Sequence, residues 1–235
     1  MRLEPLEDPF PGADVMVLIS EQESKDQPLV LVVPGLNNSG PGHWQSLWES
    51  ERSDCQRVNL GMWDKPHRNT WVNQLNLAIR QADRPVILAA HSLGCLAVAW
   101  WAQLERPGSD SPVRGALLVA PPEVDHRPHD ARVATFAPTP SIPLPFPAIL
   151  VGSHNDPYMS FRRARRLAAQ WGCSFADAGR VGHINADSGL GEWGFGQFLL
   201  EQLIRRSTQQ PITSADSPPV SSAGATFSSY QELRP

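Results

Sequence analysis

Two runs of consecutive apolar residues, each followed at once by a turn, place the strongest constraint on how this chain folds. The first is Leu29–Val33 and ends at Pro34-Gly35, and the second is Pro85–Ala90 and ends at His91-Ser92-Leu93-Gly94. Strands that are apolar at nearly every position are typical of a parallel sheet covered on both faces. The chain therefore predicts at least two fully buried strands.

Strand-like and helix-like segments alternate along the rest of the sequence. Further strands are expected at 56–60, 115–120, 148–152 and 174–176, and helices around 44–48 and at 71–81, 95–104, 162–171 and 193–206. Such alternation is typical of a sheet with helices packed on both faces. We therefore expect a three-layer α/β/α sandwich with a mainly parallel sheet.

One domain, residues 28–206, is expected between two segments of different composition. Residues 1–27 form an acidic leader whose short apolar run, 15–19, is a candidate edge strand. Residues 207–235 are rich in Ser, Thr, Pro and Gln, as in a disordered tail. Within the domain, residues 121–147 contain eight prolines and predict a long connection or a small cap over one end of the sheet.

Charge and cysteine content exclude several classes of function. The net charge is −4 and comes mainly from the leader, so no basic face for nucleic acid or an anionic membrane is expected. The first residues lack the apolar core of a signal peptide, and no apolar run approaches the ~18–20 residues of a membrane span. Three widely spaced cysteines fit reduced thiols. We expect a cytoplasmic protein.

The pentapeptide Ala90-His91-Ser92-Leu93-Gly94 predicts a nucleophile elbow. This turn between a strand and a helix needs small residues two positions before and two after the serine, because the chain reverses sharply there. Gly is usual at both positions, and Ala90 adds only one methyl group. The apolar strand before the turn and the apolar helix after it support Ser92 as a catalytic nucleophile.

A serine nucleophile needs a base and an acid that orients the base. In α/β-hydrolases the order along the chain is Ser, then Asp or Glu, then His. Asp156 follows the strand at 148–152 within a turn-forming Asn-Asp-Pro sequence, and His183 lies in a glycine-flanked loop before the last helix. We therefore predict a triad of Ser92, Asp156 and His183.

Other histidines fit this pattern less well. His126 and His129, with Asp125 and Asp130, lie in the proline-rich connection and are expected to be solvated loop residues. His154 precedes the candidate acid, which is the wrong order, and His91 should point away from the Ser92 hydroxyl.

Hydrolysis also needs backbone N–H donors for the oxyanion of the tetrahedral intermediate. One is expected from Leu93, directly after the nucleophile, and the other from the glycine-containing loop after the first strand, with Leu36 first and Asn37 second. Asn37, His43 and Trp44 are candidates to bind substrate, although core packing is the more ordinary role of Trp44. No metal-binding, P-loop or dinucleotide motif is present, so no cofactor is expected.

Residues 28–204 resemble the small serine hydrolases related to retinoblastoma-binding protein nine and their bacterial relatives, a branch of the α/β-hydrolases. The resemblance rests on Val33-Pro34-Gly35, His43-Trp44, Trp63-Asp64-Lys65-Pro66, His91-Ser92-Leu93-Gly94, Asn155-Asp156-Pro157-Tyr158 and Gly182-His183-Ile184-Asn185-Ala186-Asp187. It implies the α/β-hydrolase fold with a minimal lid, the triad given above, and hydrolysis of a carboxyl ester or small amide. It implies nothing about the leader or the tail.

The leading hypothesis is a metal-independent serine hydrolase of carboxylesterase type that acts on a small-molecule ester or amide through an acyl-enzyme on Ser92. Two alternatives remain open. One is acyl transfer by the same three residues, and the other is a protein-binding module that keeps the fold without the catalysis. The sequence does not indicate which protein such a module would bind.

Overall fold

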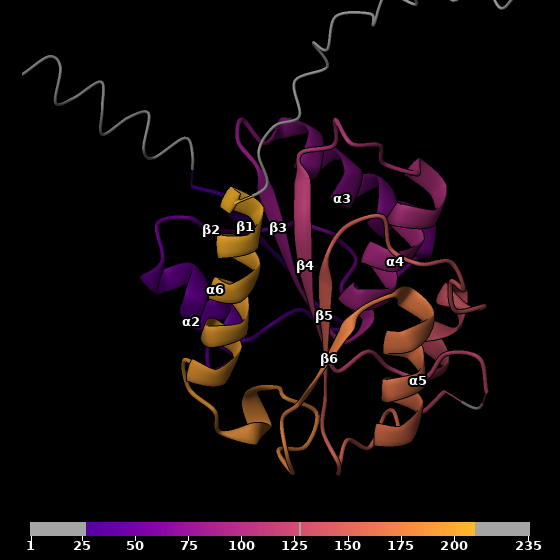
Figure 1. The fold of residues 1–235 in the computed structure, drawn as a ribbon. Helices are drawn as coiled ribbons and strands as arrows, with labels where there is room; N and C mark the ends of the chain where they lie inside the picture. The colour runs from indigo at the N-terminus through magenta and orange to yellow at the C-terminus, as the bar shows by residue number, and fades with distance from the viewer. Residues whose placement is uncertain (1–26, 127, 210–235) are drawn as a thin grey trace, which may run out of the picture.

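The computed structural model describes residues 27–126 and 128–209, and the predicted three-layer sandwich is confirmed (Figure 1). Within these residues the sheet has six strands, all parallel, in the order β2-β1-β3-β4-β5-β6. The strands are β1 Leu29–Val33, β2 Cys55–Arg57, β3 Val86–His91, β4 Val113–Val119, β5 Ala148–Gly152 and β6 Ser174–Asp177.

Helices cover both faces of this sheet. They are α2 Trp44–Glu51, α3 Arg68–Gln81, α4 Leu93–Glu105, α5 Phe161–Trp171 and α6 Gly194–Gln209. Helices α2 and α6 lie on one face, and α3, α4 and α5 lie on the other (Figure 1). No helix in the described ranges is both long enough and apolar enough to cross a membrane.

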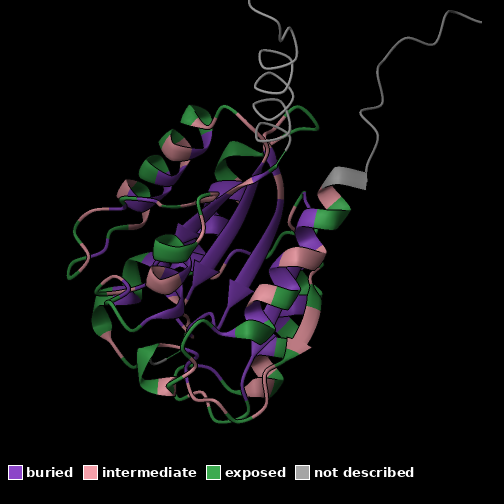
Figure 2. Ribbon diagram, turned by 90° about the vertical axis from the view of Figure 1, so that its left-hand side faces the viewer, coloured by how far each residue is buried: buried purple, intermediate pink, exposed green. Residues whose placement is uncertain are grey.

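Strand β3 shows why the central strands are apolar at every position. Leu88 and Ala90 join the core under α3, α4 and α5, whereas Ile87 and Ala89 join the core under α2 and α6. Successive side chains of a strand point to opposite faces, so a sheet covered on both sides buries them all. Figure 2 shows the central strands in the colour of buried residues, with exposed residues on the outer surfaces of the helices.

Several boundaries differ from the sequence-based expectation. Strand β2 covers Cys55–Arg57 rather than 56–60, because after Val58, whose N–H still bonds the Val32 carbonyl, the chain leaves the sheet. Helix α3 begins at Arg68 rather than at Trp71. The proline-rich connection contains a short 3₁₀ helix, η1 Ala131–Phe136, anchored by a bond from Trp100 Nε1 to the Phe136 carbonyl (2.8 Å). Residues 207–209, assigned to the tail from the sequence, continue helix α6; the rest of the predicted tail and the candidate edge strand at 15–19 lie outside the described residues.

The end of β1 packs directly against the start of α4. A Cβ atom at Gly94 would lie 2.2 Å from the carbonyl oxygen of Val33 and 2.6 Å from that of Pro34. Both are backbone atoms of a buried segment and cannot move aside as a flexible side chain would. Gly94 is therefore required for the contact between these two elements.

We expect Gly94→Ala to lower the free energy of unfolding by about 1–3 kcal/mol or more, because the added methyl group overpacks a backbone contact. Gly194→Ala is the matched control, since a Cβ atom there meets nothing within 4 Å. The control should stay within about 0.5 kcal/mol of the original protein. Urea unfolding of the three proteins measures the difference, and equal loss in both variants would contradict the packing argument.

Candidate active site

Ser92 lies on a sharp turn between β3 and α4, as predicted for an elbow. Its backbone has φ 52° and ψ −123°, an unusual conformation for a residue with a side chain. A hydrogen bond from the Ser92 N–H to the Val119 carbonyl (2.9 Å) helps to hold it. Ala90, two positions before Ser92, is fully buried, so the methyl group that it has in place of the usual glycine fits beneath the turn.

The structure brings Ser92, His183 and Asp156 together, although they are far apart in sequence. Ser92 Oγ lies 2.9 Å from His183 Nε2, and His183 Nδ1 lies 3.0 Å from both carboxylate oxygens of Asp156. The Asp156 side chain is 3% exposed, so its carboxylate is shielded from water. The three residues follow β3, β5 and β6 at the carboxyl edge of the sheet, as the chain order predicted.

Two backbone N–H groups lie free beside Ser92. Within the described part of the chain, the amides of Leu36 and Leu93 donate no hydrogen bond. They are brought close by Gly35, because a Cβ atom there would lie 2.8 Å from Ser92 Cβ and 3.2 Å from the Leu93 nitrogen. The Asn37 amide, the second candidate in the sequence, already donates to the Trp63 carbonyl (2.8 Å). The geometry therefore favours Leu36 over Asn37 as a donor.

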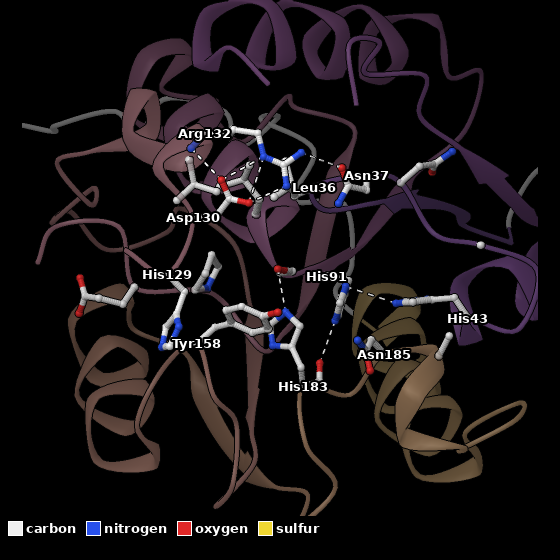
Figure 3. A pocket seen from close by; sticks show the side chains of 18 residues that line it. Leu36, Asn37, His43, His91, His129, Asp130, Arg132, Tyr158, His183 and Asn185 are labelled. Atoms are coloured by element: carbon white, nitrogen blue, oxygen red, sulfur yellow. Dashed lines mark hydrogen bonds and ion pairs between the residues drawn. The ribbon is translucent and has the colours of Figure 1, made fainter. Parts of the chain in front are cut away.

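A pocket of about 310 Å³ opens above Ser92 and His183 (Figure 3). Two of the three candidate substrate-binding residues, Asn37 and His43, line it. Trp44 does not: the indole is 1% exposed and donates to the Ile184 carbonyl, so substrate binding by Trp44 was a wrong prediction. Trp44 is the first residue of α2, and its side chain points into the core.

The connection at 121–147 contributes more to the pocket than the sequence suggested. His129 and Asp130 line it while remaining solvent-accessible loop residues, as the sequence predicted: His129 is exposed, and the Asp130 side chain is 32% exposed. Arg132 bonds both carboxylate oxygens of Asp130, and these bonds lower the pKa of Asp130 and raise that of Arg132. The same guanidinium donates to Asn37 Oδ1 (3.1 Å) and so ties the connection to the loop that carries Leu36.

Tyr158 and Arg132 are pocket residues for which the sequence predicted no role. The Tyr158 ring packs edge-on against His183, with ring centres 4.4 Å apart, and against His129 at 5.5 Å. Its position two residues after Asp156 was the available signal, since the Tyr158 N–H donates to Asp156 Oδ1 (2.9 Å). Arg132 stands in a segment without periodicity, and no sequence signal pointed to it.

His154 and His91, the other histidines considered as the base, do not contact the Ser92 hydroxyl. His154 bonds Asp177 (2.9 Å) and stacks on Phe161, away from the pocket. His91 points away from the Ser92 hydroxyl, as expected, and its Nε2 lies 3.0 Å from the His183 carbonyl oxygen. Its Nδ1 lies 3.3 Å from His43 Nε2 (Figure 3).

Burial makes His43 and His91 neutral. The pKa of His43 is lowered to about 4, first by burial and then by the charges of Arg57 and His183. The pKa of His91 is lowered well below its usual 6.5 by complete burial, with His183 and His43 adding to the effect. Neither imidazole has a carboxylate partner within hydrogen-bond distance in the described structure.

A parallel sheet with a strained serine elbow and a buried Ser–His–Asp chain defines a hydrolase of the α/β-hydrolase fold. The sequence profile of the serine hydrolase family matches residues 30–202, and the chain belongs to that family. Among the described residues, no three His, Cys, Asp or Glu side chains are grouped so as to hold a metal ion.

Solved structures agree with this assignment. A YdeN-like hydrolase from Pectobacterium atrosepticum is 32% identical, with a TM-score of 0.69 over 83% of this chain and 99% of that one. The YdeN gene product of Bacillus subtilis (18% identical, TM-score 0.60, 76% and 99% covered) shows the same fold. So does Est1E of Butyrivibrio proteoclasticus, solved with ferulic acid bound (16%, 0.53, 76% and 90%). No curated protein sequence matches the chain significantly.

We expect stability to fall in mild acid, because the unfolded chain protonates His43 near pH 6.5 while the folded protein resists until about pH 4. Stability is full above pH 6.5, where His43 is neutral in both states, and the loss grows as the pH falls, reaching about 3 kcal/mol near pH 4. Unfolding by urea at several pH values, compared between the original protein and His43→Gln, isolates this effect. Equal pH slopes in the two proteins would contradict it.

Proposed function

We propose that this protein hydrolyses a carboxyl ester or a small amide through an acyl-enzyme formed on Ser92. The observation that carries the proposal is the continuous hydrogen-bonded chain from Ser92 and His183, which line the pocket, to the shielded Asp156 carboxylate. A hydroxyl is a weak nucleophile until a base removes its proton, and this chain supplies the base in the required orientation.

In the first half of the proposed reaction, His183 Nε2 takes the Ser92 proton while Oγ attacks the substrate carbonyl carbon. The carbonyl oxygen becomes an oxyanion, which the free amides of Leu36 and Leu93 can stabilise. The bond to the leaving group then breaks, and His183 returns the proton to the departing oxygen or nitrogen. The acyl group remains on Ser92.

Water completes the reaction by the same steps, with water as the nucleophile and Ser92 as the leaving group. His183 removes a proton from a water molecule, the hydroxide attacks the acyl carbon, and Ser92 leaves with the proton that His183 returns. Asp156 accepts a hydrogen bond from the Nδ1–H of His183 throughout, which leaves Nε2 free to take a proton and stabilises the imidazolium.

The charges of the pocket favour an uncharged acyl group. Glu123 is paired with Arg163, and Asp130 with Arg132, so the charged side chains that line the pocket already have partners in the structure. The apolar lining comes from Leu36, Leu93, Pro122 and Val133. An anionic acyl group would lose hydration here without finding an unpaired cation.

We expect Ser92→Ala to abolish ester hydrolysis and covalent labelling by a fluorophosphonate probe, because the reacting oxygen is removed. Asp156→Asn should lower kcat by about 10⁴-fold, because His183 loses the carboxylate that fixes its tautomer. Ser160→Ala is the matched control: Ser160 is exposed and makes no side-chain capping bond.

Intact-protein mass spectrometry measures the covalent labelling, and the release of p-nitrophenol from p-nitrophenyl acetate measures the hydrolysis. Labelling that persists in Ser92→Ala, or its absence in the original protein, would overturn the proposal. Product formation that depends on an added alcohol or amine would indicate acyl transfer instead. A folded, unlabelled protein that holds a stoichiometric partner would indicate the binding module.

We further expect the p-nitrophenyl ester of 4-methylpentanoate to have a kcat/KM at least about tenfold above that of the similarly sized hemisuccinate, a difference of about 1.4 kcal/mol. Asp130→Asn should narrow this ratio, because it leaves the Arg132 cation unpaired beside the pocket. Steady-state rates with the two esters measure it. A preference for hemisuccinate in the original protein would contradict the neutral-pocket argument.

A further inference from the structure

Helix α2 holds the loop that carries His183 at three points. Trp44 Nε1 donates to the Ile184 carbonyl (3.0 Å), and Trp48 Nε1 donates to the Glu192 carbonyl (2.7 Å). The third point is indirect: His43, the N-cap residue of α2, contacts His91, and His91 contacts the His183 carbonyl. Figure 3 shows this line of contacts running from His43 through His91.

Only one arrangement of protons satisfies the line of contacts. The Gln45 N–H points at His43 Nδ1 (3.1 Å), so that nitrogen must accept and the His43 proton resides on Nε2. At the other end, the His183 carbonyl can only accept, so His91 carries its proton on Nε2 and offers Nδ1 to His43. Both rings are therefore neutral Nε2–H tautomers that donate in the same direction, towards His183.

Although both rings line the pocket, neither has a polar atom left for substrate. Each of the four ring nitrogens is used in the contacts just described. The rings also contact one another, with centres 4.6 Å apart for His43 and His91 and 4.9 Å for His91 and His183. Their polar chemistry is thus directed at the protein itself.

The loop needs such support because its backbone is strained. Ile184, directly after His183, has φ +53°, an outlier for a β-branched residue, and is fully buried. A strained conformation persists only where the surroundings over-determine it. Here the two consecutive carbonyl groups, those of His183 and Ile184, each accept a hydrogen bond from a buried side chain.

The start of α2 is a rigid base for this support. Gln45 is fully buried, and its amide donates to the Ala89 carbonyl (2.8 Å) and the Val33 carbonyl (3.2 Å), at the ends of β3 and β1. Ser39 Oγ donates to the remaining Gln45 oxygen (2.6 Å). The anchor of the histidine line is thus fixed to the strands that carry Ser92 and the Leu36 loop.

We propose that His91 is a positioning residue, which holds the backbone of His183 in place for proton transfer from Ser92, and that His43 fixes the tautomer in which His91 does so. This inference rests on the proposed function of Ser92 and His183, and it adds two residues that act through the base rather than on the substrate.

The test compares His91→Phe with His91→Gln. Phe keeps a ring but cannot donate, so kcat for p-nitrophenyl acetate should fall by about 10²-fold with KM unchanged, because a base displaced by about 1 Å transfers protons poorly. Gln restores a donor towards the His183 carbonyl and should recover about tenfold of that loss. The rate of fluorophosphonate labelling should follow kcat in both variants.

His154→Phe is the matched control, since His154 bonds Asp177 at the surface, and it should leave kcat unchanged. A merely structural role would lower the melting temperature of both His91 variants while the folded fraction kept its kcat, and that result would overturn the proposal. Equal loss in Phe and Gln would also overturn it.

Histidine ¹⁵N NMR of the unaltered protein tests the same proposal without a variant. At pH 7 it should show His43 and His91 protonated on Nε2 only, and an Nδ1–H form of either ring would overturn the inference. If Ser92→Ala loses labelling while His91→Phe keeps full kcat, the positioning role fails and the proposed function stands. If the original protein is not labelled at all, the proposed function fails. The NMR tautomers then still show whether His43 and His91 make the hydrogen bonds towards the His183 carbonyl.

Discussion

The packing of the end of β1 against the elbow is the contact on which the site depends. β1 and β3 are parallel neighbours, so their carboxyl ends reach the same edge of the sheet. Gly94 allows the start of α4 to touch the Val33 carbonyl, and Gly35 allows the next loop to touch Ser92. With side chains at these two positions, the Leu36 amide would stand too far from Ser92 to share an oxyanion with Leu93. The site is therefore built from backbone contact before any catalytic side chain is considered.

The surrounding core keeps Ser92 and Ile184 in strained backbone conformations. Ser92 and Ile184 both have positive φ, and each is adjacent to or part of a fully buried segment. Such conformations each cost about 1–3 kcal/mol. Leu93 on one side and Ile184 with Trp44 on the other fill the two cores that lie on opposite faces of the sheet. Because Leu93 and Ile184 belong to different cores, the proposed nucleophile and the proposed base are each adjacent to a different hydrophobic cluster.

Local patterns in the sequence were sufficient to predict the fold and to select Ser92, Asp156 and His183 as the candidate triad. The apolar runs at β1 and β3 are read without tertiary information, because burial on both faces removes the polar alternation. Asp156 and His183 follow from chain order and from the strands that precede them. The choice between Leu36 and Asn37 required the structure, because it depends on a bond from Asn37 to Trp63, far along the chain.

The parts of the site that the sequence did not predict are those made by contacts distant in sequence. Arg132 reaches Asn37 across 95 positions, and His91 reaches the His183 carbonyl across 92. No local motif encodes such a pair, and a connection without periodicity gives no sign of which side chains it turns inward. For the same reason Trp44, adjacent to a pocket residue in sequence, was named as a candidate to bind substrate, whereas its side chain takes the more ordinary role of packing in the core.

Three imidazoles gather beside Ser92, and their surroundings give them different chemistry. His183 has the Asp156 carboxylate at Nδ1, and in the proposed reaction this carboxylate would favour the imidazolium that forms when Nε2 takes a proton. His91 and His43 have only neutral partners and are buried, so their pKa values fall and they stay uncharged. A charged His91, its ring centre 4.9 Å from that of His183, would oppose the positive charge that His183 would acquire in the proposed attack. Burial without a carboxylate partner thus suits His43 and His91 to the supporting role proposed above, because neither would compete with His183 for a proton.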